Sequence, residues 1–340
     1  MMFGKLDAAV GEEGEPRTDG TPHRTGRARR SRLEGSREQA MAEADLGGNR
    51  EPARTEHGDR GTVLDPGDIA GGSGSPGTET ISAAELAEIG LRFEVDGEIA
   101  TIVLDRPGKR NAQTSATWSA LARIGENLPG QVRVVVVRGE GPSFSAGLDL
   151  SMFAPGGTSG QDSLATVATL GDDGFQRRVA EYQRGFLWLR RPDIVSIAAV
   201  QGHAIGAGFQ LALSCDLRIV ADDVKFCMKE PALGLVPDLT GTKPLVELVG
   251  VPRAIEICLT ARTVGAAEAV QLGLAEMAVP GDELAQAVQD LATALLATDR
   301  AAATATKRLL QGASGRTLEE QSAAERAEQS ARVRALFASS

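Results

Sequence analysis

Two short loops of small residues are the first candidates for chemistry in this sequence. Ser145-Ala146-Gly147 and Gly206-Ala207-Gly208 each follow an apolar segment of strand length and precede a polar loop or a helix. Turns of this kind leave backbone N–H groups pointing outward, and a helix N-terminus favours negative charge. One donor from each loop can converge on a single oxygen and form an oxyanion hole. Each loop taken alone also fits close packing between a strand and a helix.

The elements around these loops predict an α/β domain with a mixed or parallel sheet and a helical C-terminal part. Residues 132–137 and 194–200 are nearly continuous apolar runs, which are typical of strands buried on both faces. Each run leads into one of the two loops, so the unit of strand, small-residue loop and helix occurs twice. The other expected elements are a short helix capped by Ser82, strands at 91–95, 99–104, 217–220, 224–227 and 275–279, and helices at 114–128, 175–189, 209–214 and beyond 242.

The chain of 340 residues changes composition near residue 80. Phe3 is the only aromatic residue before Phe93, and Gly, Pro, Arg, Glu and Asp dominate this stretch. Such a segment cannot bury enough apolar surface to offset its ordering entropy. We therefore expect a disordered low-complexity tail over 1–79, a core domain over 80–280 and a helical region over 281–340.

Charge and cysteine content narrow the class of protein. The net charge of −10 argues against non-specific nucleic-acid binding. The basic run 24–37 is the exception, and it is either a solvated part of the tail or a contact for RNA or an anionic surface. Cys215, Cys227 and Cys258 show no disulfide framework or metal-ligand spacing, as expected of free thiols in a cytoplasmic protein. No apolar run reaches the length of a membrane helix.

Five stretches, in this order along the chain, resemble the signatures of the crotonase superfamily, the enoyl-CoA hydratase/isomerase family. They are RPGKRNA, VVVVRGEGPSFSAGLDL, VQGHAIGAGFQLALSCDLRIV, MKEPALGLVPDLTGT and ARTVGAAEAVQLGLAEMAVP, and the likeness covers residues 91–311. The resemblance implies a spiral of ββα repeats with a C-terminal helical trimerisation region. It also implies an acyl-CoA substrate, no cofactor beyond the CoA of that substrate, and a homotrimer or hexamer.

The resemblance also assigns the binding residues. It places the two oxyanion-hole N–H groups at Ala146 and Ala207. Asp149 is expected to cap or orient the first loop, and His203 to be structural. Lys307-Arg308 can reach a nucleotide bound by a neighbouring subunit. Arg106, Lys109 and Arg110 either contact the CoA phosphates, since Arg and Lys suit such contacts, or form a solvated turn. The residues expected to bind the substrate or its CoA are Arg106, Lys109, Gly147, Asp149, Gly206 and Gly208.

Three residues occupy the expected catalytic positions. Glu230 matches the acid that the family retains most often, and Gln210 stands where the related hydratases have a second glutamate. Glutamine cannot exchange a proton, so we expect Gln210 to position the substrate. Asp238 follows Glu230 by eight residues, a spacing that resembles dienoyl-CoA isomerases, and it is either a second acid or a turn residue.

These assignments favour an enoyl-CoA isomerase that uses Glu230, with or without Asp238. A 2-enoyl-CoA hydratase or an acyl-CoA thioester hydrolase on the same site is the alternative within the family. A non-catalytic acyl-CoA- or RNA-binding protein is the alternative from another class.

Overall fold

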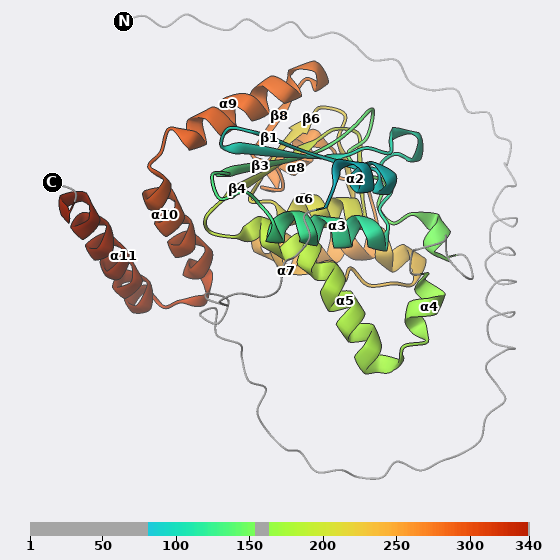
Figure 1. Ribbon diagram of the computed structural model, residues 1–340. Helices are drawn as coiled ribbons and strands as arrows, with labels where there is room; N and C mark the ends of the chain where they lie inside the picture. Colours follow the sequence, from blue (N-terminus) through green and yellow to red (C-terminus); the bar gives the residue numbers. More distant parts are fainter. Residues whose placement is uncertain (1–80, 154–162, 339–340) are drawn as a thin grey trace, which may run out of the picture. The chain divides into compact units, whose positions relative to one another are not determined.

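The computed structural model describes residues 81–153 and 163–338, which form a mixed α/β unit (Figure 1). The expected tail over 1–79, with its basic run, lies outside the described residues. The main sheet has six strands in the order β1-β2-β3-β4-β6-β8. β1 and β2 are antiparallel, and all the other pairs are parallel. The strands are β1 (Leu91–Asp96), β2 (Ile99–Leu104), β3 (Val134–Gly139), β4 (Val195–Val200), β6 (Leu217–Ala221) and β8 (Met277–Val279).

A second, two-stranded parallel sheet continues from the main sheet toward the two small-residue loops. It consists of β5 (His203–Ile205) and β7 (Lys225–Cys227), with Ala204 opposite Phe226. Because β5 follows β4 and β7 follows β6 after short turns, both segments leave the main sheet in the same direction. The second sheet thereby brings the segment before residue 206 and the segment before residue 230 side by side.

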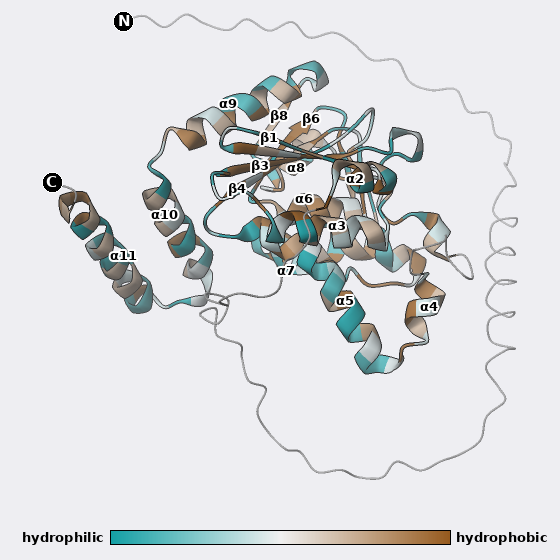
Figure 2. Cartoon of the chain, in the orientation of Figure 1, coloured by the Kyte–Doolittle hydropathy of each residue, from teal (hydrophilic) through white to brown (hydrophobic). Residues whose placement is uncertain are grey.

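Helices cover both faces of the main sheet. Val135 and Val137 of β3 point into the larger core, whereas Val134 and Val136 point into a smaller core on the opposite face. Because both faces of β3 are buried, its residues form a continuous apolar run. Figure 2 shows hydrophobic residues along the central strands of the sheet. The helices are α2 (Ala83–Ile89), α3 (Ser115–Glu126), α4 (Leu164–Ala168), α5 (Gly171–Leu187), α6 (Ala207–Ser214), α7 (Thr242–Thr260), α8 (Ala266–Gln271), α9 (Leu284–Leu296), α10 (Arg300–Gly312) and α11 (Leu318–Ala338).

The sequence analysis predicted most of these helices and strands, but some of their first residues differ in the structure. The capping box predicted at Ser82 is present, because Ser82 Oγ accepts from the N–H of Glu85 and Glu85 Oε2 accepts from the N–H of Ser82. α6 begins at Ala207 rather than at residue 209, so the small residues of the second loop form the first turn of the helix. α5 begins at Gly171 rather than at residue 175, because Asp172 and Asp173 suit a first helical turn.

The last three helices continue from the sheet as an arm. α9 packs on the smaller core through Leu284, Val288 and Ala292, whereas α11 has no buried residue. This confirms the expected helical C-terminal region. No helix in the two described stretches is long and apolar enough to cross a membrane.

Lys307 fastens α10 to the end of the main sheet. Its Nζ donates to the carbonyl oxygens of Arg191 and Ile194, each at 2.7 Å, and to Asp216 Oδ2 at 2.6 Å. The ammonium group is therefore directed inward and fully engaged. The expectation that Lys307 reaches a bound nucleotide is wrong, and Arg308 pairs with Glu328 of α11 at 3.1 Å.

We predict that Lys307→Met lowers the free energy of unfolding by about 3–5 kcal/mol, because it leaves the Asp216 carboxylate buried without its cation. The side chains of Lys307 and Asp216 are only 12% and 15% exposed. Lys243→Met is the control, since Lys243 is 80% exposed in its pair with Glu247 and should change the free energy by less than about 0.5 kcal/mol. Urea unfolding measures both, and equal effects would contradict the anchoring role of Lys307.

Candidate active site

The two small-residue loops lie against each other, as the sequence predicts. Ser145 forms a parallel bridge with Ala204, through bonds from Ser145 N to His203 O at 2.8 Å and from Ile205 N to Ser145 O at 3.0 Å. A Cβ atom on Gly147 would lie 2.4 Å from the Ile205 carbonyl oxygen and 3.5 Å from the Ala207 nitrogen. Gly147 also has a φ of 87°, so only glycine fits this contact.

One of the two predicted oxyanion donors is not available. The N–H of Ala146 donates to the carbonyl oxygen of Arg110 at 2.8 Å, which ties the first loop to the Arg106–Asn111 turn. A donor already bonded within the protein cannot bind a substrate oxygen without losing that bond. The assignment of Ala146 to the oxyanion hole is therefore wrong.

Leu148 supplies the free donor of the first loop instead. Gln113 N donates to Gly147 O at 2.7 Å, and Asp149 N donates to Gln113 O at 2.8 Å, so Gln113 binds both residues that flank Leu148. In a trans peptide the N–H points away from the carbonyl oxygen of the preceding residue. The N–H of Leu148 consequently points away from Gln113, and it has no hydrogen-bond partner within 81–153 and 163–338.

Ala207 is the donor predicted for the second loop, and its backbone N–H is open to a ligand. It is the first residue of α6, so its N–H has no acceptor within the helix. Gly206 before it has a φ of 52° and a ψ of −118°, a conformation that side chains strongly disfavour. Leu148 and Ala207 thus offer two backbone donors from adjacent loops, and such a pair can stabilise negative charge on a carbonyl oxygen.

Glu230 lies directly beside the second loop. It begins the short 3-10 helix Glu230–Leu233, which follows β7. A Cβ atom on Gly206 would lie 3.0 Å from Glu230 Oε1, so the carboxyl group borders the residue before Ala207. Oε1 accepts a hydrogen bond from Gln210 Nε2 at 2.7 Å, whereas Oε2 is buried and has no partner in the described part of the chain. Oε2 is the oxygen free to exchange a proton.

The surroundings favour the protonated form of Glu230. Burial raises its pKa above the usual 4.5, and the negative charge of Asp238 acts in the same direction. Hydrogen bonds from the backbone and from Gln210 oppose this rise. Burial also raises the pKa of Asp238, whose carbonyl oxygen accepts from Gln183 Nε2 of α5 at 2.7 Å. The structure thus brings Asp238 within electrostatic reach of Glu230.

Gln210 holds Glu230 in place through its side-chain amide. Its side chain is fully buried, and its Oε1 accepts from Leu239 N at 2.9 Å and from Gly241 N at 3.2 Å. Its Nε2 donates to Glu230, so both ends of the amide bind protein groups. This amide joins Glu230 to the loop at 239–241, and the expectation that Gln210 positions the substrate stays a prediction.

The residues expected to bind CoA separate into two groups. The Arg106 guanidinium pairs with Asp149 Oδ2 at 2.8 Å and donates to Ala112 O at 2.7 Å, so it connects its own turn to the first loop. Asp149 also accepts from the N–H of Ser151, as expected of a residue that orients this loop. Lys109 is exposed at the end of its turn, and its contact with CoA stays a prediction.

The remaining sequence expectations concern structural residues. His203 Nδ1 lies 3.2 Å from Ser143 Oγ, and burial lowers its pKa, in line with a structural role. Cys215, Cys227 and Cys258 are free thiols, and burial raises the pKa of Cys215 to about 12. Over the described ranges no three His, Cys, Asp or Glu residues gather as metal ligands.

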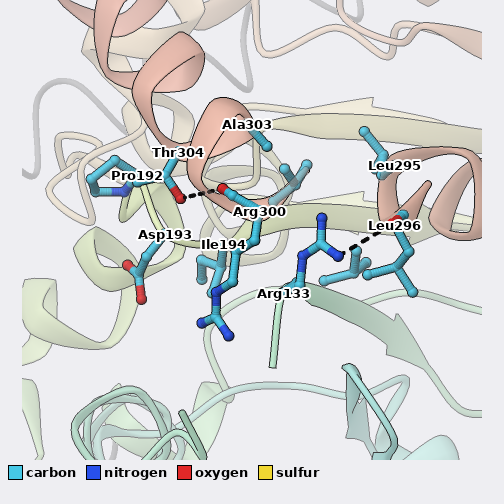
Figure 3. Close-up of a pocket in the computed structure, with 11 residues that line it drawn as sticks. Arg133, Pro192, Asp193, Ile194, Leu295, Leu296, Arg300, Ala303 and Thr304 are labelled. Atoms are coloured by element: carbon cyan, nitrogen blue, oxygen red, sulfur yellow. Dashed lines mark hydrogen bonds between the residues drawn. The ribbon is translucent and has the colours of Figure 1, made fainter. Parts of the chain in front are cut away.

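A small cavity between β4 and the arm is not a second site. It measures about 20 Å³ and lies beside Arg133, Asp193 and Arg300 (Figure 3). Its two arginines are engaged, since Arg133 donates to Leu296 O at 3.2 Å and Arg300 donates to Gly130 O at 2.7 Å. A space of this size holds about one water molecule.

Comparison with known proteins shows the family of this chain. Residues 94–335 match the enoyl-CoA hydratase/isomerase family. The chain is 30% identical to a probable enoyl-CoA hydratase of Mycobacterium tuberculosis over 207 residues, which are 60% of this chain and 74% of that protein. It is 34% identical to the carnitinyl-CoA dehydratase of Escherichia coli over 209 residues, which are 61% of this chain and 74% of that protein.

Solved structures extend the likeness to the fold. A Thermobifida fusca protein in complex with CoA, whose assignment as an enoyl-CoA hydratase is provisional, is 58% identical with a TM-score of 0.73. The match covers 77% of this chain and 99% of that one. A second Thermobifida fusca structure, in complex with acetoacetyl-CoA, is also 58% identical with a TM-score of 0.73, and covers 75% of this chain and 99% of that one.

We predict that the raised pKa of Glu230 makes stability depend on pH in a specific direction. The folded protein retains the proton at pH values where the unfolded chain has lost it, so stability falls as pH rises from about 4.5 to the raised pKa. Glu230→Gln should remove this part of the decline, as urea unfolding at several pH values would show.

Glu85→Gln is the control for that measurement. The hydrogen bond from the Ser82 backbone lowers the pKa of Glu85, so its contribution is present above pH 4.5 and is lost as pH falls. The two substitutions should therefore change the pH slope in opposite directions. The same slope in Glu230→Gln and the wild type would contradict a raised pKa at Glu230.

Proposed function

Because the chain belongs to the enoyl-CoA hydratase/isomerase family, within the crotonase superfamily, we propose that it moves a proton on the acyl chain of a CoA thioester. The observation that carries this proposal is the position of Glu230. Its buried, unpartnered Oε2 lies beside a loop that ends in a free backbone donor. An acid–base group next to an oxyanion hole is what enolate chemistry requires.

In this proposal the N–H groups of Leu148 and Ala207 bind the thioester oxygen. Loss of a proton from the acyl chain moves negative charge onto that oxygen, and the two fixed donors stabilise it as the enolate forms. Donors of this kind are each worth about 3 kcal/mol of transition-state stabilisation. No side chain supplies the effect, which makes the backbone geometry of the two loops decisive.

Glu230 removes a proton from one carbon of the acyl chain and returns it to another. Its raised pKa brings it closer to neutral pH, where it can both accept and donate. Gln210 cannot take part in proton transfer, and its amide is occupied by Glu230, Leu239 and Gly241. One carboxyl group, with or without Asp238, suits a double-bond shift better than the addition of water.

Hydration of a 2-enoyl-CoA is the second candidate. It is supported by the names of the relatives from Mycobacterium tuberculosis and Escherichia coli, a hydratase and a dehydratase. In that case Glu230 would activate the water without a second carboxylate. Hydrolysis of the thioester would use the same hole, with water attacking the carbonyl carbon. The CoA and acetoacetyl-CoA complexes of the Thermobifida fusca protein support a CoA ester as substrate in all three cases.

Assembly and location complete the proposal. α11 has no buried residue and exposes Leu336 and Phe337, at 66% and 76%. We expect this helix to pack against another subunit of a homotrimer or hexamer. We also propose a cytoplasmic location, on the basis of the three free cysteines. We also propose that the core domain spans residues 80–280 and that the helical region spans residues 281–340.

We predict that the protein, incubated in heavy water with 2-enoyl-, 3-enoyl- and 3,5-dienoyl-CoA esters, incorporates deuterium into a shifted double bond without gaining a whole heavy water. Glu230→Ala should lower this rate by at least about 100-fold, since it removes the only proposed base at the hole. Mass spectrometry of the products distinguishes the candidates.

The other products have definite meanings. Gain of a whole heavy water would establish the hydratase, and release of free CoA would establish the hydrolase. Full activity in Glu230→Ala would refute the assigned acid–base role. Binding of the esters with no reaction would indicate the non-catalytic acyl-CoA-binding class.

We further predict that Gln210→Glu changes the pH dependence of the reaction. The new carboxylate would replace the amide that lies 2.7 Å from Glu230 Oε1, and two carboxyl groups this close share a proton. The apparent pKa of the pair should split, so that one limb of the kcat/KM profile moves to higher pH. Gln210→Leu is the control, because it removes the donor without adding charge. Identical pH profiles for the two variants would contradict this coupling.

A further inference from the structure

We propose that the buried hydroxyl of Ser145 is a positioning group for the oxyanion hole. Trp118 and Gln113 orient this hydroxyl through hydrogen bonds, and the hydroxyl binds Gly147 and thereby sets the direction of the Leu148 N–H. This inference rests on the proposed function, because it assigns to Ser145 the orientation of one of the two donors. Ser145 itself does not touch the substrate in this proposal.

The Ser145 hydroxyl lies at the centre of three hydrogen bonds. It donates to Asn111 O at 2.8 Å, and it accepts from Gln113 Nε2 at 3.0 Å and from Gly147 N at 3.2 Å. The side chain is fully buried, as is that of Gln113. A hydroxyl can donate one hydrogen bond and accept two, so Ser145 has no capacity left over.

The direction of each of these hydrogen bonds is fixed by Trp118. An indole nitrogen can only donate, and Trp118 Nε1 donates to Gln113 Oε1 at 2.9 Å. The amide of Gln113 must therefore present its NH₂ group to Ser145. With this donor and the Gly147 N–H on its two acceptor positions, the Ser145 proton can go only to Asn111 O.

These hydrogen bonds restrict the backbone of Gly147, whose conformational freedom would otherwise change the direction of the Leu148 N–H. Gly147 has no side chain and a φ of 87°, and it directly precedes the proposed donor at Leu148. Its N–H binds Ser145 Oγ, and its carbonyl oxygen binds Gln113 N at 2.7 Å. Both peptide groups of Gly147 are thus attached to Gln113, one through Ser145 and one directly. Loss of the hydroxyl would release one of these attachments and let the Leu148 N–H change direction.

A side chain at position 145 must fit against the first turn of α6. A Cβ atom on Gly208 would lie 2.6 Å from Ser145 O and 3.0 Å from Ser145 Oγ, so the first turn of α6 packs directly on this serine. Ser145→Ala therefore removes the hydroxyl while keeping the close packing. Ser145→Cys restores a weaker donor and acceptor at the same position.

The experiment compares Ser145→Ala with Ser196→Ala in the full chain. Ser196 is an equally buried hydroxyl that donates to Leu189 O and accepts from Asp216 N, and it lies at the far end of β4 from the loops. The first readout is turnover of the most active ester. The second is isotope-edited infrared spectroscopy of bound butanoyl-CoA labelled with ¹³C at its thioester carbonyl, which reports polarisation without a reaction.

We expect kcat to fall about 10-fold in Ser145→Ala, with KM changed by less than about 2-fold, because a misaligned donor weakens the transition state more than binding. The downshift of the labelled carbonyl should shrink in Ser145→Ala and return in part in Ser145→Cys. Ser196→Ala should match the wild type in both readouts.

The outcomes separate this inference from the function on which it rests. A wild-type carbonyl shift that stays unchanged in Ser145→Ala would overturn the role of Ser145 and leave the hole in place. A wild type that binds butanoyl-CoA without any carbonyl shift would overturn the hole and this inference together. If Ser145→Ala does not fold, the comparison of Ser145→Cys with the wild type decides the same question.

Discussion

The short parallel pairing between Ser145 and Ala204 is the interaction on which the site depends. It joins two loops that leave separate strands of the main sheet, and it places Gly147 against the first residue of α6. Without this pairing, the N–H groups of Leu148 and Ala207 would belong to unconnected surface turns. The second sheet extends the same arrangement to β7, so that Glu230 reaches the loop from the other side. The positions of the donors and of the acid are thus set by backbone pairing, and side chains only refine them.

Much of this arrangement follows from the sequence. The consecutive valines of β3 predicted a strand buried on both faces, and hence the α/β class, and the capping box predicted at Ser82 is present. The two small-residue loops were predicted to lie together, and the structure pairs them. The sequence failed at the choice between Ala146 and Leu148, because that choice depends on which side of a bridge each N–H faces. Gly147, which separates the two residues, has a φ of 87°, so the chain is not extended here, and the direction of each N–H depends on backbone angles that side-chain identity does not reveal.

Contacts between residues far apart in the sequence are the second feature that could not be predicted. The sequence singled out Gln210 as a departure from the paired glutamates of related hydratases, but its contacts could not be predicted from its own neighbourhood in the chain. Its amide is defined by Glu230, 20 residues later, and by the N–H groups of residues 239 and 241. Arg106 shows the same limit, because its partner Asp149 lies on another loop. Charged and amide side chains near a loop can face either the ligand or the protein, and only tertiary contacts decide between these directions.

The neutral amide at position 210 also fits the electrostatics of the pocket. Glu230 and Asp238 are both partly buried, and each has a raised pKa, so the site already resists negative charge. A carboxylate at position 210 would add a third such group 2.7 Å from Glu230. The amide instead donates a hydrogen bond, which favours the ionised form of Glu230 and partly offsets the effect of burial. A base that must lose and regain a proton benefits from this balance, since either extreme would fix it in one state. In the proposed function, glutamine at position 210 carries no proton-transfer group, and its hydrogen bond adjusts the pKa of Glu230.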